Sequence, residues 1–120
     1  MDNNISGKTG EDAVCDKLVK EGYRIIVRNF AVHNVGELDV VAQKDNVVHV
    51  IEVKTRRASN ISNYGAPESY ITQSKMHKIR KCTNYLIARY GLYDNDIVFD
   101  AGSVVIDRAG NVLSVDIFEI

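Results

Sequence analysis

The chain has 120 residues and a net charge of −1, with 45% hydrophobic and 26% charged residues. A chain of this size and composition can bury its own core, so it needs neither disulfides nor a structural metal to fold. Its apolar stretches are too short to span a bilayer, and its polar N-terminus lacks the apolar core of a signal peptide. We therefore expect a single cytoplasmic domain over residues 1–120, with no membrane partner.

The first half of the chain predicts one helix followed by three strands. Residues 8–21 carry an apolar helical stripe, with Thr9 as a cap and acids in the first turn. Residues 23–30 alternate as a strand does. Residues 38–42 and 47–53 are rich in β-branched side chains and are joined by a short polar turn, which is a hairpin signal.

The second half predicts one helix and a second hairpin. The remaining elements are a loop over residues 55–64, a helix start at Pro67 and Glu68, a helix over residues 72–90 that Gly91 ends, and a hairpin of residues 97–106 and 112–120 turned at 107–111. The order α-β-β-β-α-β-β indicates an α/β fold with a central mixed sheet flanked by helices.

Basic residues are concentrated in the middle of the chain. Residues 54–81 carry seven Lys or Arg and one acid, whereas residues 1–53 carry six and nine, and residues 82–120 carry two and six. A local basic patch is the electrostatic footprint of a phosphate partner. A solvated helix face is the alternative, and charge alone does not decide between the two.

Four charged residues interrupt the first predicted hairpin. Strand residues two apart point to the same face of a sheet. Glu37 and Asp39 therefore share a face on one strand, and Glu52 and Lys54 share a face on the next. If the turn is centred between residues 45 and 46, the numbers of two directly opposed residues add up to 91. Asp39 then faces Glu52, and Glu37 faces Lys54.

Two carboxylates that face each other repel unless a cation or a proton lies between them. Hard oxygen ligands suit Mg²⁺ or Mn²⁺, so Asp39 and Glu52 form a candidate metal site. Glu11, on the same stripe as Cys15 and Leu18, could point toward the same metal; the alternative is a helix-start acid stabilised by the dipole. The alternative for the whole set is a cross-strand salt-bridge ladder, which leaves Asp39 facing Glu52 with no cation.

The stretches Gly36–Asp39 and Glu52–Lys54 resemble the PD-(D/E)xK nuclease signature. The wider pattern resembles the YraN-like family of small bacterial predicted endonucleases, which are distantly similar to archaeal Holliday junction resolvases. The further matching stretches are Gly10–Ala13, Gly22–Tyr23, Arg28–Phe30, Val40–Ala42, Val50–Ile51, Thr55–Arg56, Lys75, Tyr85–Leu86 and Phe99–Asp100. The resemblance covers most of the chain.

The resemblance implies a restriction-endonuclease-like fold and a Mg²⁺- or Mn²⁺-dependent endonuclease. Branched or junction DNA is the expected substrate, and because such a substrate calls for two active sites, we expect a homodimer. It makes Asp39, Glu52 and the backbone carbonyl of Val53 metal ligands. It also makes Glu11 an acid that assists metal binding and Lys54 the catalytic lysine. It gives Asp100 no role beyond structure, because the residues after Asp100 depart from the family's pattern.

The remaining candidates are surface cations and histidines. Side chains expected to contact backbone phosphates are Arg56, Arg57, Lys75, Lys78 and Arg80, each with a solvated surface position as its alternative. The loop after Lys54 is expected to shape substrate choice. The histidines His33, His49 and His77 show no partner spacing and are expected to be non-catalytic, and Cys15 and Cys82 are expected to be reduced packing residues.

Two other functions compete with the endonuclease. One is a nucleic-acid-binding or assembly module that keeps the nuclease fold without catalysis, and the intact Asp39, Glu52 and Lys54 speak against it. The other is a metal-dependent hydrolase of a smaller phosphate ester, which needs an enclosed pocket. A steep salt dependence of DNA binding is expected for the endonuclease and for the binding module, and not for the hydrolase of a smaller phosphate ester.

Overall fold

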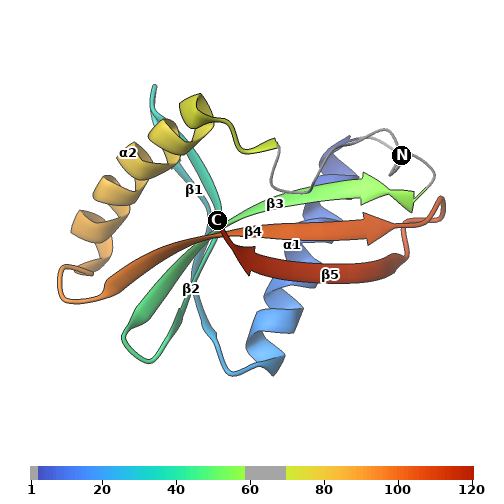
Figure 1. Ribbon diagram of the computed structural model, residues 1–120, viewed down its shortest axis with the longest axis horizontal. Coiled ribbons are helices and arrows are strands. Elements are labelled where there is room, and N and C mark those ends of the chain that lie inside the picture. Colours follow the sequence, from blue (N-terminus) through green and yellow to red (C-terminus); the bar gives the residue numbers. More distant parts are fainter. Residues whose placement is uncertain (1–2, 59–69) are drawn as a thin grey trace.

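The computed structural model describes residues 3–58 and 70–120 (Figure 1). Its elements are α1 (Asn3–Lys20), β1 (Arg24–Val32), β2 (Gly36–Lys44), β3 (Val47–Arg57), α2 (Gln73–Tyr90), β4 (Asp96–Ile106) and β5 (Val112–Glu119). The predicted order of helices and strands is confirmed. None of the helices in the described ranges has the length and apolar character that crossing a membrane requires.

The five strands form one mixed sheet in the order β1-β2-β3-β4-β5. All neighbours are antiparallel except β3 and β4, which run parallel and are connected through α2. The β2–β3 ladder runs from Lys44 opposite Val47 to Val40 opposite Ile51. Each of these pairs sums to 91, so the predicted hairpin register is confirmed.

Each face of the sheet is covered by one helix, and each helix buries its own apolar cluster. Figure 1 shows α1 behind the β3–β5 part of the sheet and α2 at the β1–β2 end. The α1 cluster contains Val14, Cys15, Leu18, Val40, Ala42, Ile51, Val104 and Ile106. The α2 cluster contains Leu38, Val41, Val48, Val50, Ile79, Cys82, Leu86 and Leu92. Both cysteines are free and buried, which confirms their packing role.

The predicted ends of α2 and the second turn are confirmed in detail. The Thr72 side chain accepts a hydrogen bond from the Lys75 N–H at 3.1 Å, and Gly91 ends the helix with a left-handed φ of 66°. In the β4–β5 turn, one carboxylate oxygen of Asp107 accepts the N–H groups of Ala109 and Asn111. These side-chain bonds replace ladder bonds where the chain reverses.

Two predicted boundaries are wrong. The first helix begins at Asn3 and not at residue 8, so Thr9 lies inside α1 and Glu11 lies more than two turns from its start. Residues 55–57 belong to β3 and not to a loop, because they continue the parallel ladder with β4 as far as Arg57 opposite Ile106. The rest of the predicted loop and the helix start at Pro67 and Glu68 fall largely within residues 59–69, outside the described residues.

Two glycines of α1 are expected to respond in opposite ways to alanine. A Cβ at Gly7 would meet nothing within 4 Å, whereas one at Gly10 would overlap the Thr55 hydroxyl and lie 3.4 Å from Val53 Cγ1. We expect Gly7→Ala to stabilise the protein by about 0.5–1 kcal/mol through helix propensity, and Gly10→Ala to destabilise it by about 1–3 kcal/mol through overpacking. Urea unfolding measures both; equal effects would contradict this close approach of α1 to β3.

Candidate metal and phosphate site

The candidate site lies where the sheet forks. Pairing between β2 and β3 ends at Val40 and Ile51. Beyond this point β2 stays with β1 as far as Gly36 opposite Val32, while β3 stays with β4. The predicted Glu37–Lys54 pair lies beyond the fork, and the described residues show no ion pair between these two side chains. The salt-bridge ladder is therefore not formed.

Asp39 and Glu52 meet at the fork and replace the missing ladder bonds. The Val53 N–H donates to Asp39 Oδ2 at 2.8 Å, and the Asp39 N–H donates to Glu52 Oε2 at 3.2 Å. Each carboxylate thus uses one oxygen to hold the backbone of the other strand. The predicted approach of these two acids is found, and their side chains are fixed by the backbone bonds that the fork leaves open.

Glu52 is buried with only 3% of its surface exposed. Burial is the main cause that raises the pKa of Glu52 to about 8, and the Asp39 charge adds to it. The Lys75 charge acts in the opposite direction, and the two carboxyl groups are close enough to share a proton. Burial and the Asp39 charge therefore favour a protonated form of this carboxyl pair, and a metal ion bound by the pair would displace that proton.

The donor set suits a small hard cation. Mg²⁺ is commonly bound through one or two carboxylates and keeps several of its waters, so Asp39 and Glu52 suffice as protein side-chain ligands. Among residues 3–58 and 70–120, no three histidine, cysteine or acidic side chains form a cluster that could hold a metal. A structural zinc site, which takes four protein ligands, does not fit the described residues.

Glu11 approaches this site from α1. Its pKa is raised mainly by burial, and the charge of Asp39 also raises it. A hydrogen bond from the Asn29 side chain and the neighbouring Arg28 guanidinium, 3.6 Å from Glu11 Oε1, lower it. Glu11 is therefore a half-buried acid within electrostatic reach of Asp39. The helix-start alternative is excluded, because Glu11 lies inside α1.

Asn29 lies in one of the stretches that match the family pattern, but its contact with Glu11 was not predicted. It lies in β1 between the residues that pair with Val40 and Leu38, and its φ is 53°. Positive φ is uncommon outside glycine and is best tolerated by asparagine and aspartate. The side chain leaves the regular strand pattern here and reaches Glu11. Strand periodicity carries no signal for such a residue.

Two lysines flank the acids. Lys54 follows Glu52 by two residues on β3, as predicted, and its side chain is exposed. Lys75, in the first turn of α2, lies near enough to Glu52 to favour its charged form. Tyr70, which no sequence pattern indicated, donates a hydrogen bond from its hydroxyl to the Glu52 backbone carbonyl at 3.1 Å, and its ring lies 5.4 Å from Lys75 Nζ. Tyr70 therefore ties the start of α2 to the strand that carries Glu52.

An open cleft leads from solvent to Glu52. Its volume is about 390 Å³, and the described residues that line it are Gly36, Glu37, Glu52, Thr72, Ser74, Lys75, Lys78 and Ile79. Acids therefore line the sheet side of the cleft and cations the α2 side. A phosphate group in the cleft would meet the lysines of α2, while a cation would reside with the carboxylates.

The profile of an uncharacterised protein family, UPF0102, matches residues 10–106. The chain belongs to UPF0102. A UPF0102 protein of Dictyoglomus thermophilum is 36% identical over 113 residues, covering 94% of this chain and 92% of its own. One of Trichlorobacter lovleyi is 38% identical over 105 residues, covering 87% and 80%. One of Alkaliphilus metalliredigens is 34% identical over 102 residues, covering 85% and 86%.

The UPF0102 match includes every candidate residue of the site. It begins at Gly10, one residue before Glu11, and ends at Ile106, the last residue of β4. The fork, the cleft and all of α2 lie within it. The strand β5 lies outside the matched residues, and none of the predicted site residues comes from it.

The other predicted phosphate contacts differ in their position. Arg56 is buried, with 7% of its surface exposed, and donates to Ser103 Oγ at 3.2 Å, so it is not a surface cation as predicted. Arg57 lies five residues beyond Glu52, where it donates to the Arg108 carbonyl at 3.5 Å. Arg80 is exposed but lies over the Phe99 ring, outside the cleft lining. Only Lys75 and Lys78 of the predicted set line the cleft.

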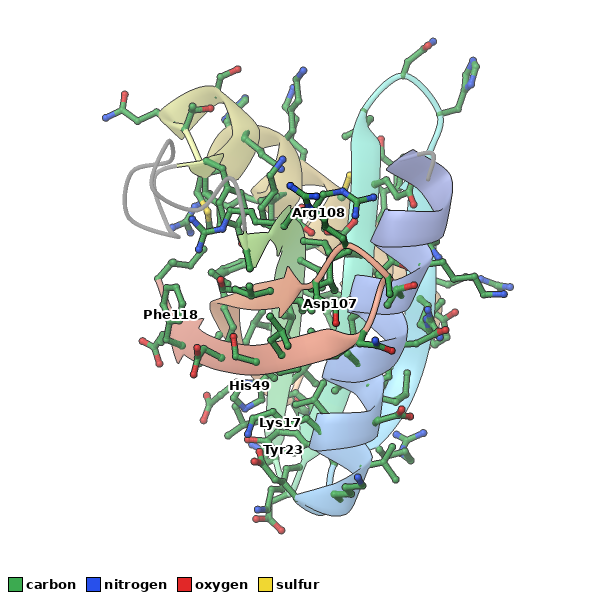
Figure 2. All side chains as sticks on the ribbon, turned by 90° about the vertical axis from the view of Figure 1, so that its right-hand side faces the viewer. Lys17, Tyr23, His49, Asp107, Arg108 and Phe118 are labelled. Carbon is green, nitrogen blue, oxygen red and sulfur yellow. The ribbon has the colours of Figure 1, made fainter. Side chains whose placement is uncertain are left out.

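His49 has a partner that its sequence spacing did not indicate. Its Nδ1 lies 2.6 Å from Oδ2 of the buried Asp100, and its ring packs edge-on against Tyr23. Figure 2 shows His49 with Tyr23 and Lys17 near the end of the sheet away from Arg108. Ile51, which alternates with Glu52 along β3, packs in the α1 cluster, so this pair lies on the face opposite the cleft. Asp100 is thus occupied in fixing His49.

Proposed function

We propose that this protein is a Mg²⁺- or Mn²⁺-dependent nuclease that hydrolyses nucleic-acid phosphodiesters at the fork between β2 and β3. The observation that carries the proposal is the meeting of Asp39 with the buried Glu52, whose pKa is raised to about 8 by burial and by the Asp39 charge. This arrangement costs stability unless a cation or a proton neutralises it. The resemblance to PD-(D/E)xK nucleases supports the same assignment.

Each residue of the site has its own role in the proposed reaction. Asp39 and Glu52, with the Val53 carbonyl, would hold the cation, and Glu11 would assist from α1. When bound, the cation supplies the positive charge that polarises a phosphoryl oxygen and activates water. Lys54 orients the attacking water and offsets the charge that develops on the phosphate. Lys75 and Lys78 hold the phosphate backbone in the cleft.

The reaction is a hydrolysis with a simple balance. The oxygen of water forms a bond to phosphorus, and the bond from phosphorus to the 3′ oxygen breaks. One proton of the water ends on the leaving 3′ oxygen, which becomes a 3′-hydroxyl, and the other passes to solvent from the new 5′-phosphate. Branched or junction DNA, which has two strands to cut, is the proposed physiological substrate, and a homodimer would present two such sites.

The experiment is a cleavage panel. Purified protein is incubated with labelled single strand, duplex, flap and four-way junction, with Mg²⁺, with Mn²⁺ and with EDTA. Cleavage that needs a metal and is lost in Asp39→Asn, with nucleic-acid binding kept, supports the proposal. Binding that is unchanged in Asp39→Asn, without cleavage of any substrate, identifies the non-catalytic binding module instead. Hydrolysis of small phosphate esters alone would support the metal-dependent hydrolase of smaller substrates instead.

A further inference from the structure

The helix α2 is unusually one-sided in charge. Its 18 residues include five Lys or Arg and no Asp or Glu. Isolated helices gain stability from pairs of opposite charge three or four residues apart, and α2 forgoes every such pair. A helix whose cations are left without acidic partners on the same helix is suited to an anionic ligand.

Three of the five Lys or Arg residues of α2 share one exposed stripe with an aromatic residue. Residues at successive spacings of four, three, four and four lie on one side of a helix. On α2 these are Ser74, Lys78, Lys81, Tyr85 and Arg89, and all five are exposed. We call this set the outer stripe of α2. The buried residues of α2 are Ile79, Cys82, Thr83 and Leu86, which lie on the arc of the helix beside the stripe.

The outer stripe begins at the cleft. Ser74 and Lys78 line the cleft together with Glu52. Tyr85 lies seven residues further on, which is about 10 Å along the helix axis at 1.5 Å per residue. A strand whose phosphate is held near Lys78 can therefore continue along the stripe toward Tyr85 without leaving the protein surface.

Tyr85 decides which kind of strand the stripe fits. Its surface is 55% exposed, although an aromatic ring of this size is usually more buried. The bases of a duplex are stacked inside the helix, so backbone cations alone would serve to bind it. An exposed aromatic ring among cations offers a stacking platform to an unpaired base, which is how single strands are commonly bound.

We propose that the outer stripe of α2 binds a single-stranded segment of nucleic acid, with a base stacked on Tyr85 and phosphates at Lys78, Lys81 and Arg89. The inference rests on the proposed function for what enters the cleft. It defines the substrate as a nucleic acid with an unpaired arm next to the phosphate that is cut.

The test is a stacking reporter placed on the stripe. The chain contains no tryptophan, so Tyr85→Trp introduces a single indole whose fluorescence is quenched when a base stacks on it. Without metal, titration with oligo-dT and, separately, with oligo-U is expected to quench this fluorescence, and added salt is expected to reverse the effect. In the control Tyr93→Trp, at a residue 74% exposed and beyond the end of α2, no quenching is expected.

Affinity measurements give a second and independent test. Tyr85→Ala is expected to weaken single-strand binding by about 5- to 150-fold, the range found for loss of one stacked base. Tyr85→Phe, which keeps the ring, is expected to bind as the wild type does. Lys81→Ala is expected to lower the salt slope for a single strand by about 0.7, the value of one phosphate contact. Duplex affinity is expected to change little in Tyr85→Ala.

The outcomes separate this inference from the proposed nuclease. Equal loss of single-strand and duplex affinity in Tyr85→Ala, or no loss of either, would overturn the stacking role of Tyr85. Binding is measured without metal. If the protein binds single strands through Tyr85 but cuts no substrate, the binding role of the outer stripe is supported and the proposed nuclease is contradicted. If the wild type is a metal-dependent nuclease, and its Tyr85→Ala variant cuts flaps at the wild-type rate and binds single strands as tightly as the wild type, the nuclease is supported and the binding role of Tyr85 is contradicted.

Discussion

Replacing Glu52 by glutamine is expected to make the protein more stable, and the gain is expected to grow with pH. Burial and the Asp39 charge raise the pKa of Glu52 from 4.5 to about 8. Between these two values the folded protein binds more protons than the unfolded chain, so the free energy of unfolding falls as pH rises, by at most ~1.4 kcal/mol per unit. This loss of stability is absent below pH 4.5 and complete above about pH 8.

Glutamine at this position keeps an oxygen that can accept the Asp39 N–H and carries no charge. We expect Glu52→Gln to be more stable than the wild type by on the order of 2 kcal/mol at pH 8, with a weaker pH dependence through the window between the two pKa values. Denaturant unfolding at several pH values measures this difference. Glu37→Gln, at an exposed residue of the same cleft, is the control and is expected to stay within about 0.5 kcal/mol of the wild type.

A Glu52→Gln variant that is less stable than the wild type at pH 8 would contradict the account of Glu52 as a strained, desolvated acid. Saturating Mn²⁺ is expected to stabilise the wild type, because it binds the ionised form of the carboxyl, and to have little effect on the variant. Equal metal stabilisation of both proteins would place the cation elsewhere.

Removing the Lys54 ammonium is expected to slow cleavage greatly with little effect on folding. A positioned group that aids proton transfer or offsets developing charge is worth about 10²- to 10⁴-fold in rate. Lys54 is exposed, so Lys54→Ala is expected to change the free energy of unfolding by no more than about 0.5 kcal/mol. Single-turnover cleavage and equilibrium binding of the same labelled substrate measure the two effects separately.

The matched control for Lys54 is Lys20→Ala, which removes an exposed lysine from the last turn of α1. Its cleavage rate is expected to equal that of the wild type. Cleavage by Lys54→Ala within a few-fold of the wild-type rate would remove Lys54 from the catalytic site. A loss of substrate affinity as large as the loss of rate would make Lys54 a phosphate contact instead.

The sequence predicted the elements that follow from local patterns. The β2–β3 register followed from the turn position, and it brought Asp39 to Glu52. The end of α2 followed from Gly91, whereas Thr72, which the pattern placed inside the helix, caps its start. The start of α1 was missed because its first residues are polar and carry no apolar stripe, while Thr9, followed by acids, has the features of a helix start.

The contacts that periodicity could not predict depend on strand order or on irregular backbone. His49 and Asp100 are 51 residues apart and meet only because β3 and β4 are parallel neighbours, a pairing that the connection through α2 determines. Asn29 reaches Glu11 through a positive φ that interrupts β1. The burial of Arg56 similarly follows from the extension of β3 beyond the predicted strand end.

The most direct test of the central claim is a single-turnover cleavage assay of the wild type and Glu52→Gln, purified in parallel, with Mn²⁺ on the best substrate of the panel. We predict cleavage by the wild type, and a rate at least about 10³-fold lower for the variant, although the variant is the more stable of the two folded proteins. Because its folding is intact, lost cleavage would reflect lost chemistry. Equal rates for the two proteins, or no metal-dependent cleavage by the wild type on any substrate, would contradict a nuclease site at the fork of β2 and β3.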